Sequence, residues 1–204
     1  MSQPDRQRAS GLKGASAAKG RAELAADVLE RARAGEPEAC RALVERYQRP
    51  VFAVLSRILA SGHRQDMVED LAQETFLRVF GALGRFDPSG PARLSTWILT
   101  IATRLALDVL RRRTVEVPAH EDKIIAMPGR QRADQLAQRR SLGRAIERAV
   151  GQLKPEFRAV FVLRMYHELS YLEIAQILDC DLGTVKSRLS RAKAALRQSL
   201  EAVR

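Results

Sequence analysis

An amphipathic helix near the C-terminus is the feature that most restricts how this chain can fold. Its apolar side is a stripe of residues at helical spacing: Val185, Leu189, Ala192 and Leu196. The helix should begin near Leu182 and run to the C-terminus. Because such a stripe buries only one side, the helix must pack against other helices while its polar side stays in water.

A shorter helix should precede it. Ser170 and Glu173 have the spacing of a capping box, and apolar residues follow at 174, 177 and 178. The turn Asp179–Cys180–Asp181 separates the two helices, and Asp181 can cap the second one. A short helix, a tight turn and a second helix form a helix-turn-helix, whose second helix lies in the major groove of DNA.

The polar side of the long helix is basic. Residues 182–204 contain six Lys or Arg residues, and Glu201 is the one acidic residue. Arg and Lys can bind guanine edges, and polar groups at the helix start suit phosphate. The candidate DNA-binding residues are Thr184, Lys186, Ser187, Arg188, Ser190 and Arg191. The alternative is a surface helix whose basic side is simply solvated.

Composition supports a helical nucleic-acid-binding protein. The chain has 35 Lys and Arg residues against 24 Asp and Glu residues, and a net charge of +11 favours a polyanionic partner. Aromatic residues make up only 5%, and Ala, Leu and Arg are abundant, so we expect an all-α fold. No apolar run is long enough for a membrane helix. The two cysteines, Cys40 and Cys180, are far apart, which favours a cytoplasmic protein without a disulfide framework.

The first half should also be helical. One helix is expected over about 22–34, ending at Gly35, and another from Glu38 onward, which Pro50 should kink or split. A further helix over about 66–83 carries acidic residues on its polar side. A Pro- and Gly-rich loop over 87–91 then leads to a helix over about 95–113 that ends in three arginines.

These elements predict two small helical domains joined by a flexible linker. We expect a disordered basic arm over 1–21, a first domain over 22–113, a linker over 114–140 and a second domain over 141–204. No nucleotide-binding loop, metal-ligand cluster or catalytic arrangement stands out. We therefore expect no enzymatic activity, no cofactor, no bound metal and no small-molecule substrate.

The second domain resembles region 4 of the extracytoplasmic-function (ECF) sigma factors of bacterial RNA polymerase. The similar stretch is LKPEFRAVFVLRMYHELSYLEIAQILDCDLGTVKSRLSRAKAAL, residues 153–196, and GTVKSRLSRAKAAL is its most specific part. The resemblance implies that this domain binds the promoter −35 element and contacts the flap of the polymerase β subunit. In the family a Gly and a Pro often flank the cysteine of the turn, where this chain has Asp179 and Asp181.

The first domain resembles region 2 of the same family. VEDLAQETFLRVFGALGRFD (68–87) is similar to region 2.2, and STWILTIATRLALDVLRRR (95–113) is similar to regions 2.3 and 2.4. The resemblance implies that Asp70, Gln73 and Glu74 contact the clamp helices of the polymerase β′ subunit. It also implies a surface that binds and melts the −10 element, with the candidates Arg93, Trp97, Thr100, Arg104, Arg111 and Arg112.

Two of these positions carry alternatives. Trp97 can be a core anchor of the first domain instead of a residue that stacks on a base. Where the family often has an Arg-Asn pair, this chain has Thr103 and Arg104, which puts the DNA contacts of both positions in question.

The sequence thus predicts an alternative sigma factor that binds core RNA polymerase and promoter DNA and initiates transcription. The family implies a separate anti-sigma factor as a partner, which could hold the protein at the membrane. One alternative is an ordinary helix-turn-helix regulator that binds a symmetric DNA site as a dimer without polymerase. A second is an RNA-binding protein, which only the charge favours.

Overall fold

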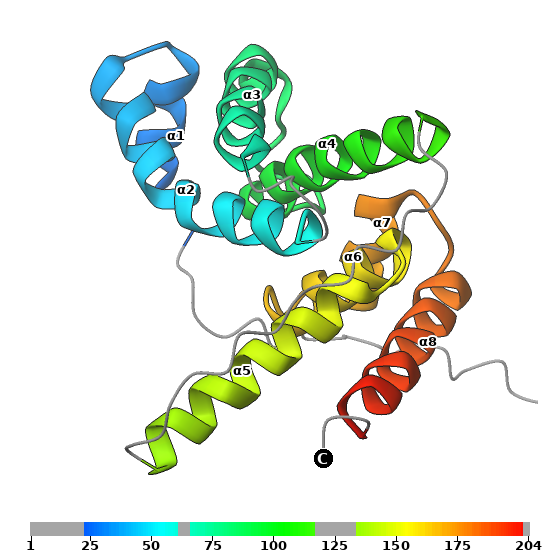
Figure 1. The fold of residues 1–204 in the computed structure, drawn as a ribbon. Coiled ribbons are helices and arrows are strands. Elements are labelled where there is room, and N and C mark those ends of the chain that lie inside the picture. Colours follow the sequence, from blue (N-terminus) through cyan, green and yellow to red (C-terminus); the bar gives the residue numbers. More distant parts are fainter. Residues whose placement is uncertain (1–22, 61–65, 117–133, 202–204) are drawn as a thin grey trace, which may run out of the picture.

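The structure is a computed structural model that describes residues 23–60, 66–116 and 134–201, and every regular element in these ranges is a helix (Figure 1). The N-terminal half contains α1 (Ala26–Arg33), α2 (Pro37–Ile58), α3 (Met67–Ala82), a 3₁₀ turn (Leu83–Arg85) and α4 (Leu94–Glu116). The C-terminal half contains α5 (Asp134–Gln152), α6 (Pro155–Met165), α7 (Tyr171–Leu178) and α8 (Leu182–Glu201). The predicted all-α fold is confirmed.

Helix α2 is the centre of the N-terminal half and packs against α1, α3 and α4. Gly35 has φ +81°, a left-handed conformation that suits glycine and turns the chain from α1 into α2. The sequence predicts that Pro50 kinks or splits this helix, and the structure excludes the split, because α2 continues through Pro50 as one helix. Pro50 and its neighbour Val51 are both buried, and packing on three sides outweighs the local cost of a missing N–H group.

The C-terminal half is built around α8. Helices α5, α6 and α7 all contact it. The predicted stripe is confirmed, because Val185, Leu189, Ala192 and Leu196 are its buried residues. Helix α5 begins at Asp134, inside the range expected to be a linker, and α4 continues to Glu116.

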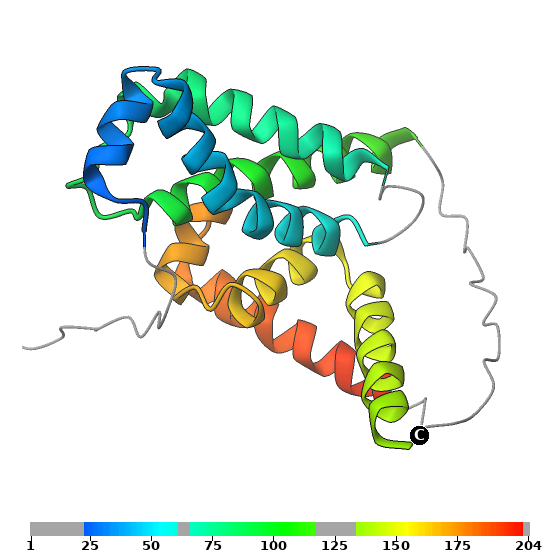
Figure 2. The same cartoon turned by 90° about the vertical axis from the view of Figure 1, so that its left-hand side faces the viewer.

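The two halves pack directly against each other (Figure 2). Helix α4 contacts α6 and α7, while α2 contacts α5 and α6. The buried apolar residues of both halves form one continuous cluster, from Leu29 to Leu196. The arm over 1–21 and the middle of the expected linker lie outside the described residues, so these domain limits remain predictions.

Candidate nucleic-acid interface

The helix-turn-helix is formed by α7 and α8, and side chains hold both helix starts. Ser170 caps α7 by accepting a hydrogen bond from the Glu173 amide, and Glu173 accepts one from the Ser170 amide at 2.8 Å. The predicted capping box is therefore confirmed. Asp181 accepts hydrogen bonds from the amide and hydroxyl groups of Thr184 at 2.7 and 2.8 Å, which fixes the start of α8.

The turn between the helices depends on Asp179. This residue has φ 49° and ψ 57°, a left-handed conformation in which Gly is the usual residue and Asp is tolerated. The Cys180 thiol is half-buried, and burial raises its pKa. A neutral, half-buried thiol packs in the turn as a small apolar side chain.

The polar side of α8 faces solvent along its length. Lys186, Ser187, Ser190 and Arg191 are exposed, whereas Thr184 and Arg188 are half-buried. The hydroxyl of Thr184 already donates to Asp181, so Thr184 helps to fix the start of α8. Five of the six candidates therefore lie on or beside one exposed basic surface: Lys186, Ser187, Arg188, Ser190 and Arg191. The sixth, Thr184, is bonded to Asp181.

Helix α4 positions the second group of candidates differently. Arg93 is exposed just before α4, and Arg111 and Arg112 are exposed near its C-terminal end, where Arg111 pairs with Asp108 at 3.5 Å. Trp97 is half-buried with its ring centroid 5.2 Å from that of Phe86. This ring contact supports the core-anchor alternative for Trp97.

Two further α4 candidates form hydrogen bonds with backbone carbonyls of the protein. The Thr100 hydroxyl donates to the Thr96 carbonyl at 2.8 Å. The Arg104 guanidinium donates to the carbonyls of Ile177 and Gln176, at 3.1 and 3.2 Å, near the end of α7. Thr103, next to Arg104, is fully buried and therefore unavailable to DNA. The structure does not bring the α4 candidates together on one open surface.

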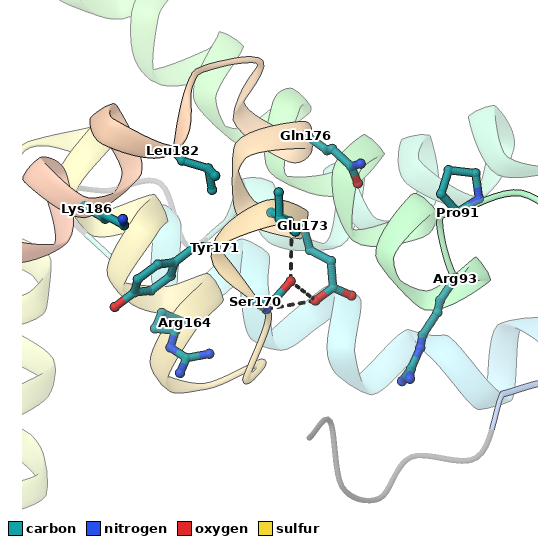
Figure 3. Close-up of a pocket in the computed structure, with 10 residues that line it drawn as sticks. Pro91, Arg93, Arg164, Ser170, Tyr171, Glu173, Gln176, Leu182 and Lys186 are labelled. Atoms are coloured by element: carbon teal, nitrogen blue, oxygen red, sulfur yellow. Dashed lines mark hydrogen bonds between the residues drawn. The ribbon is translucent and has the colours of Figure 1, made fainter. Parts of the chain in front are cut away.

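A cavity of about 650 Å³ lies where the two halves meet, beside the α7 start (Figure 3). Arg93 lines it from the first half, and Arg164 and Lys186 line it from the second. The Arg164 guanidinium lies 5.3 Å from the Tyr171 ring centroid and donates to the Leu169 carbonyl at 2.9 Å. These cations make the cavity wall positive.

Glu173 is the acidic residue of this cavity wall. Its burial raises its pKa, but hydrogen bonds from the Ser170 amide and hydroxyl groups and from Thr96 lower it more, so the pKa lies below the usual value. Glu173 is therefore ionised at neutral pH and serves as a hydrogen-bond acceptor within the fold.

Helix α3 carries the third group of candidates. Asp70 and Gln73 are exposed, and Glu74 forms an ion pair with Arg78 at 2.6 Å, which reduces the negative charge of this surface. Leu77 lies on the same side, one turn after Gln73, and is 68% exposed. The sequence analysis did not single out Leu77. Its spacing of four residues from Gln73 and three from Glu74 nevertheless places it on the same side of the helix.

Sequence reasoning also missed Arg158, because a single arginine on an apolar helix has no distinctive local pattern. Arg158 is 2% exposed, and its guanidinium donates to the carbonyls of Ile58, Gly151 and Leu153. Only the tertiary structure shows that this residue joins the two halves.

Two chemical features are absent from the ranges 23–60, 66–116 and 134–201. No group of His, Cys, Asp and Glu side chains is arranged to hold a metal ion there. None of the helices that the structure describes is long and apolar enough to cross a membrane.

The fold and its basic recognition helix define a helix-turn-helix protein, and comparison with known families makes this specific. Sigma-70 region 2 matches residues 43–115, and Sigma-70 region 4 matches residues 143–196. The ECF RNA polymerase sigma factor SigW of Bacillus subtilis (strain 168) is 30% identical over 183 residues, covering 84% of this chain and 94% of SigW. SigE of Mycolicibacterium smegmatis, also an ECF sigma factor, is 36% identical over 160 residues, 78% of this chain and 60% of SigE.

A solved structure is similar over most of the chain. CnrH in complex with the cytosolic domain of CnrY is similar with a TM-score of 0.60 and 26% identity, covering 86% of this chain and 96% of CnrH. The chain belongs to the ECF RNA polymerase sigma factors, a subfamily of the sigma-70 family. It is an alternative sigma factor, which is a transcription initiation factor.

Proposed function

We propose that this sigma factor directs core RNA polymerase to its promoters by binding the −35 element with α8 and the −10 element with α4. The observation that carries the proposal is the exposed basic side of α8, with Lys186 and Arg191 outside the buried stripe. Helix α8 is a second helix held at a fixed start by Asp181, which is the geometry that major-groove binding requires.

The experiment is a reconstitution with polymerase. The purified chain is mixed with sigma-free core RNA polymerase and fragmented genomic DNA, and transcript starts are mapped. We expect discrete starts that share two upstream sequence elements, because α8 and α4 bind separate sites. Starts that do not depend on the added chain, or a chain that does not bind core polymerase, would contradict the proposal.

Helix α3 is the proposed contact with the β′ clamp helices. Asp70, Gln73 and Glu74 form its polar side, and the exposed Leu77 would be the apolar centre of the contact. The Leu77→Ala variant should bind core polymerase about 10-fold more weakly, as expected for an anchor of an interface. Phe52→Ala is the matched control, because Phe52 is also exposed in this half but lies on α2.

Further assignments follow from the family. The C-terminal half would contact the β flap, and a separate anti-sigma factor would hold the protein inactive, in the cytoplasm or at the membrane. The cytosolic domain of CnrY bound to CnrH supports a protein partner of this kind. In this proposal the chain is not an enzyme, takes no cofactor or small-molecule substrate, and supplies promoter specificity to the polymerase.

A further inference from the structure

Glu23 joins the first described residues of the chain to the start of α4. Its carboxylate accepts hydrogen bonds from the Ser95 hydroxyl at 2.5 Å and from the Ser95 amide at 3.2 Å. Ser95 is the second residue of α4, in the turn whose backbone amides have no acceptor within the helix. A carboxylate 72 residues away in the sequence thus caps the first turn of α4.

Tyr47 of α2 holds the same segment from the other side. Its hydroxyl donates to the Glu23 carboxylate at 2.8 Å and accepts a hydrogen bond from the Leu24 amide at 3.1 Å. Tyr47 is 4% exposed, and burial raises its pKa, so the phenol is neutral and able to donate at physiological pH. The side chain of one residue and the backbone of the next are both bound, which fixes the point at which residues 1–22 join the fold.

The Glu23 carboxylate occupies a position at which a helix start could bind phosphate. Backbone amides at a helix N-terminus attract anions, and here the anion belongs to the chain itself. Phosphate binding at this end of the proposed −10 surface then depends on cationic side chains. Arg93, two residues before Ser95, is exposed there.

Residues 1–22 supply further cations next to this point. They contain five Lys or Arg residues, and Asp5 is their one acidic residue. A residue spans at most about 3.6 Å of chain, so the Cα atom of Arg21 lies within about 7 Å of that of Glu23, and that of Lys19 within about 14 Å. The hydrogen bonds of Glu23 therefore keep two cations beside the start of α4.

We propose that Lys19 and Arg21 bind the phosphate backbone of promoter DNA beside the −10 element, and that the contact of Glu23 with Ser95 positions them. This rests on the proposed function of α4 and adds contacts that carry no sequence information. DNA is the favoured partner, because the anchor lies on α4, which carries the proposed −10 surface, whereas the proposed polymerase contact lies on α3. Each neutralised phosphate releases counterions, so these contacts make promoter binding more sensitive to salt.

The test compares two pairs of cations in the complex with core polymerase. The near-pair variant carries Lys19→Gln and Arg21→Gln. The distant-pair variant carries Arg6→Gln and Arg8→Gln and is the matched control, because it removes the same charge at least 15 residues from Glu23. Affinity for a mapped promoter is measured between 50 and 200 mM salt.

We expect the near-pair variant to reduce the slope of log affinity against log salt by about 1.8, which is about 0.9 for each lost phosphate contact. The advantage of the parent chain over this variant should therefore shrink about 12-fold between 50 and 200 mM salt. The distant-pair variant should change the slope by less than about half as much.

Equal changes of slope in the two variants, or no change in either, would overturn the proposal. Weaker binding of the near-pair variant to core polymerase without DNA would also overturn it, because the two cations would then contact the polymerase. If the parent chain with core polymerase does not bind the promoter at all, the proposed function is wrong and the role of these cations falls with it. Normal promoter binding by the parent chain together with identical slopes removes only the present proposal.

A variant at the anchor separates position from charge. Glu23→Ala combined with Tyr47→Phe removes the bonds that hold Ser95 and the Leu24 amide, and we expect the difference in slope between the near and distant pairs to fall by at least about half. Glu38→Ala is the control for charge, because Glu38 is exposed in the first turn of α2, and it should leave that difference unchanged. Circular dichroism checks that both variants keep the helical fold. A difference that persists in full without the anchor would contradict the positioning role of Glu23.

Discussion

Helices α8 and α4 carry the two proposed DNA-binding surfaces, and they differ in how available they are. Lys186 and Arg191 of α8 are exposed, whereas Arg104 of α4 is bonded to the end of α7. The two surfaces belong to one chain but are presented differently, because α4 packs against α6 and α7 of the other half, whereas α8 packs mainly within its own half. Whether a residue is free to bind DNA therefore depends on the tertiary arrangement. The sequence pattern of a helix only identifies candidate residues.

The largest effect should come from removing the buried cation at the contact. Arg158→Met leaves helix-end carbonyls of both halves without their donor, so we expect the free energy of unfolding to fall by about 2–4 kcal/mol. Urea unfolding followed by circular dichroism measures this. Arg148→Met is the control, because Arg148 is exposed on α5 and should change stability by less than about 0.5 kcal/mol. Equal losses in both variants would show that Arg158 does not hold the halves together.

The next effect concerns the open surface. Replacing Lys186 and Arg191 by Ala should lower −35-dependent transcription by about 10- to 100-fold, since each base contact contributes about 1–3 kcal/mol. Transcription from a template with an intact −35 element is compared with one whose −35 element is scrambled. Arg197→Ala on the same helix is the control, because Arg197 is exposed but outside the proposed surface. If transcription by the double variant depended normally on the −35 element, α8 would not be the helix that binds this element.

Acid should weaken the capped start of α7. The pKa of Glu173 is lowered in the folded protein, so its contribution to stability is complete above its unfolded pKa of about 4.3 and is lost as pH falls through the lower folded value. Glu173→Gln removes the charge but keeps a hydrogen-bond acceptor, and we expect a loss of about 0.3–1 kcal/mol at pH 7.

Stability measured from pH 7 to pH 3 checks this. The difference between Glu173→Gln and the parent chain should shrink as the pH falls below about 4. A difference that stays constant over this range would mean that the charge of Glu173 does not support α7.

The smallest effect should be a gain at the turn. Asp179 adopts a left-handed conformation, which costs a non-glycine residue about 1 kcal/mol. Asp179→Gly should therefore raise the free energy of unfolding by up to about 0.5–1 kcal/mol, measured by thermal unfolding. A less stable variant would show that the Asp179 side chain contributes more than its backbone conformation costs.

The local elements were predictable where short-range patterns decide the structure. The capping box of Ser170 and the buried stripe that begins at Val185 follow from spacing alone, and both are confirmed. Of the two expectations for Pro50, a kink or a split, the split is excluded, because packing from three neighbouring helices holds α2 together as one helix.

The contact between the halves was beyond sequence reasoning. Arg104 and Arg158 bind backbone carbonyls, which every residue has, so no residue pattern indicates their partners. The candidate DNA-binding residues were chosen by type and by family resemblance, and their roles remain predictions that the variants above test.

The most direct measurement is permanganate footprinting of a mapped promoter, which detects unpaired thymines. With core polymerase and this chain together, we predict reactive thymines at the −10 element and protection of the −35 element from nuclease. Either component alone should leave the −10 thymines paired. Protection of a symmetric site by the chain alone, with no reactive thymines when polymerase is added, would contradict the account and favour a dimeric helix-turn-helix regulator.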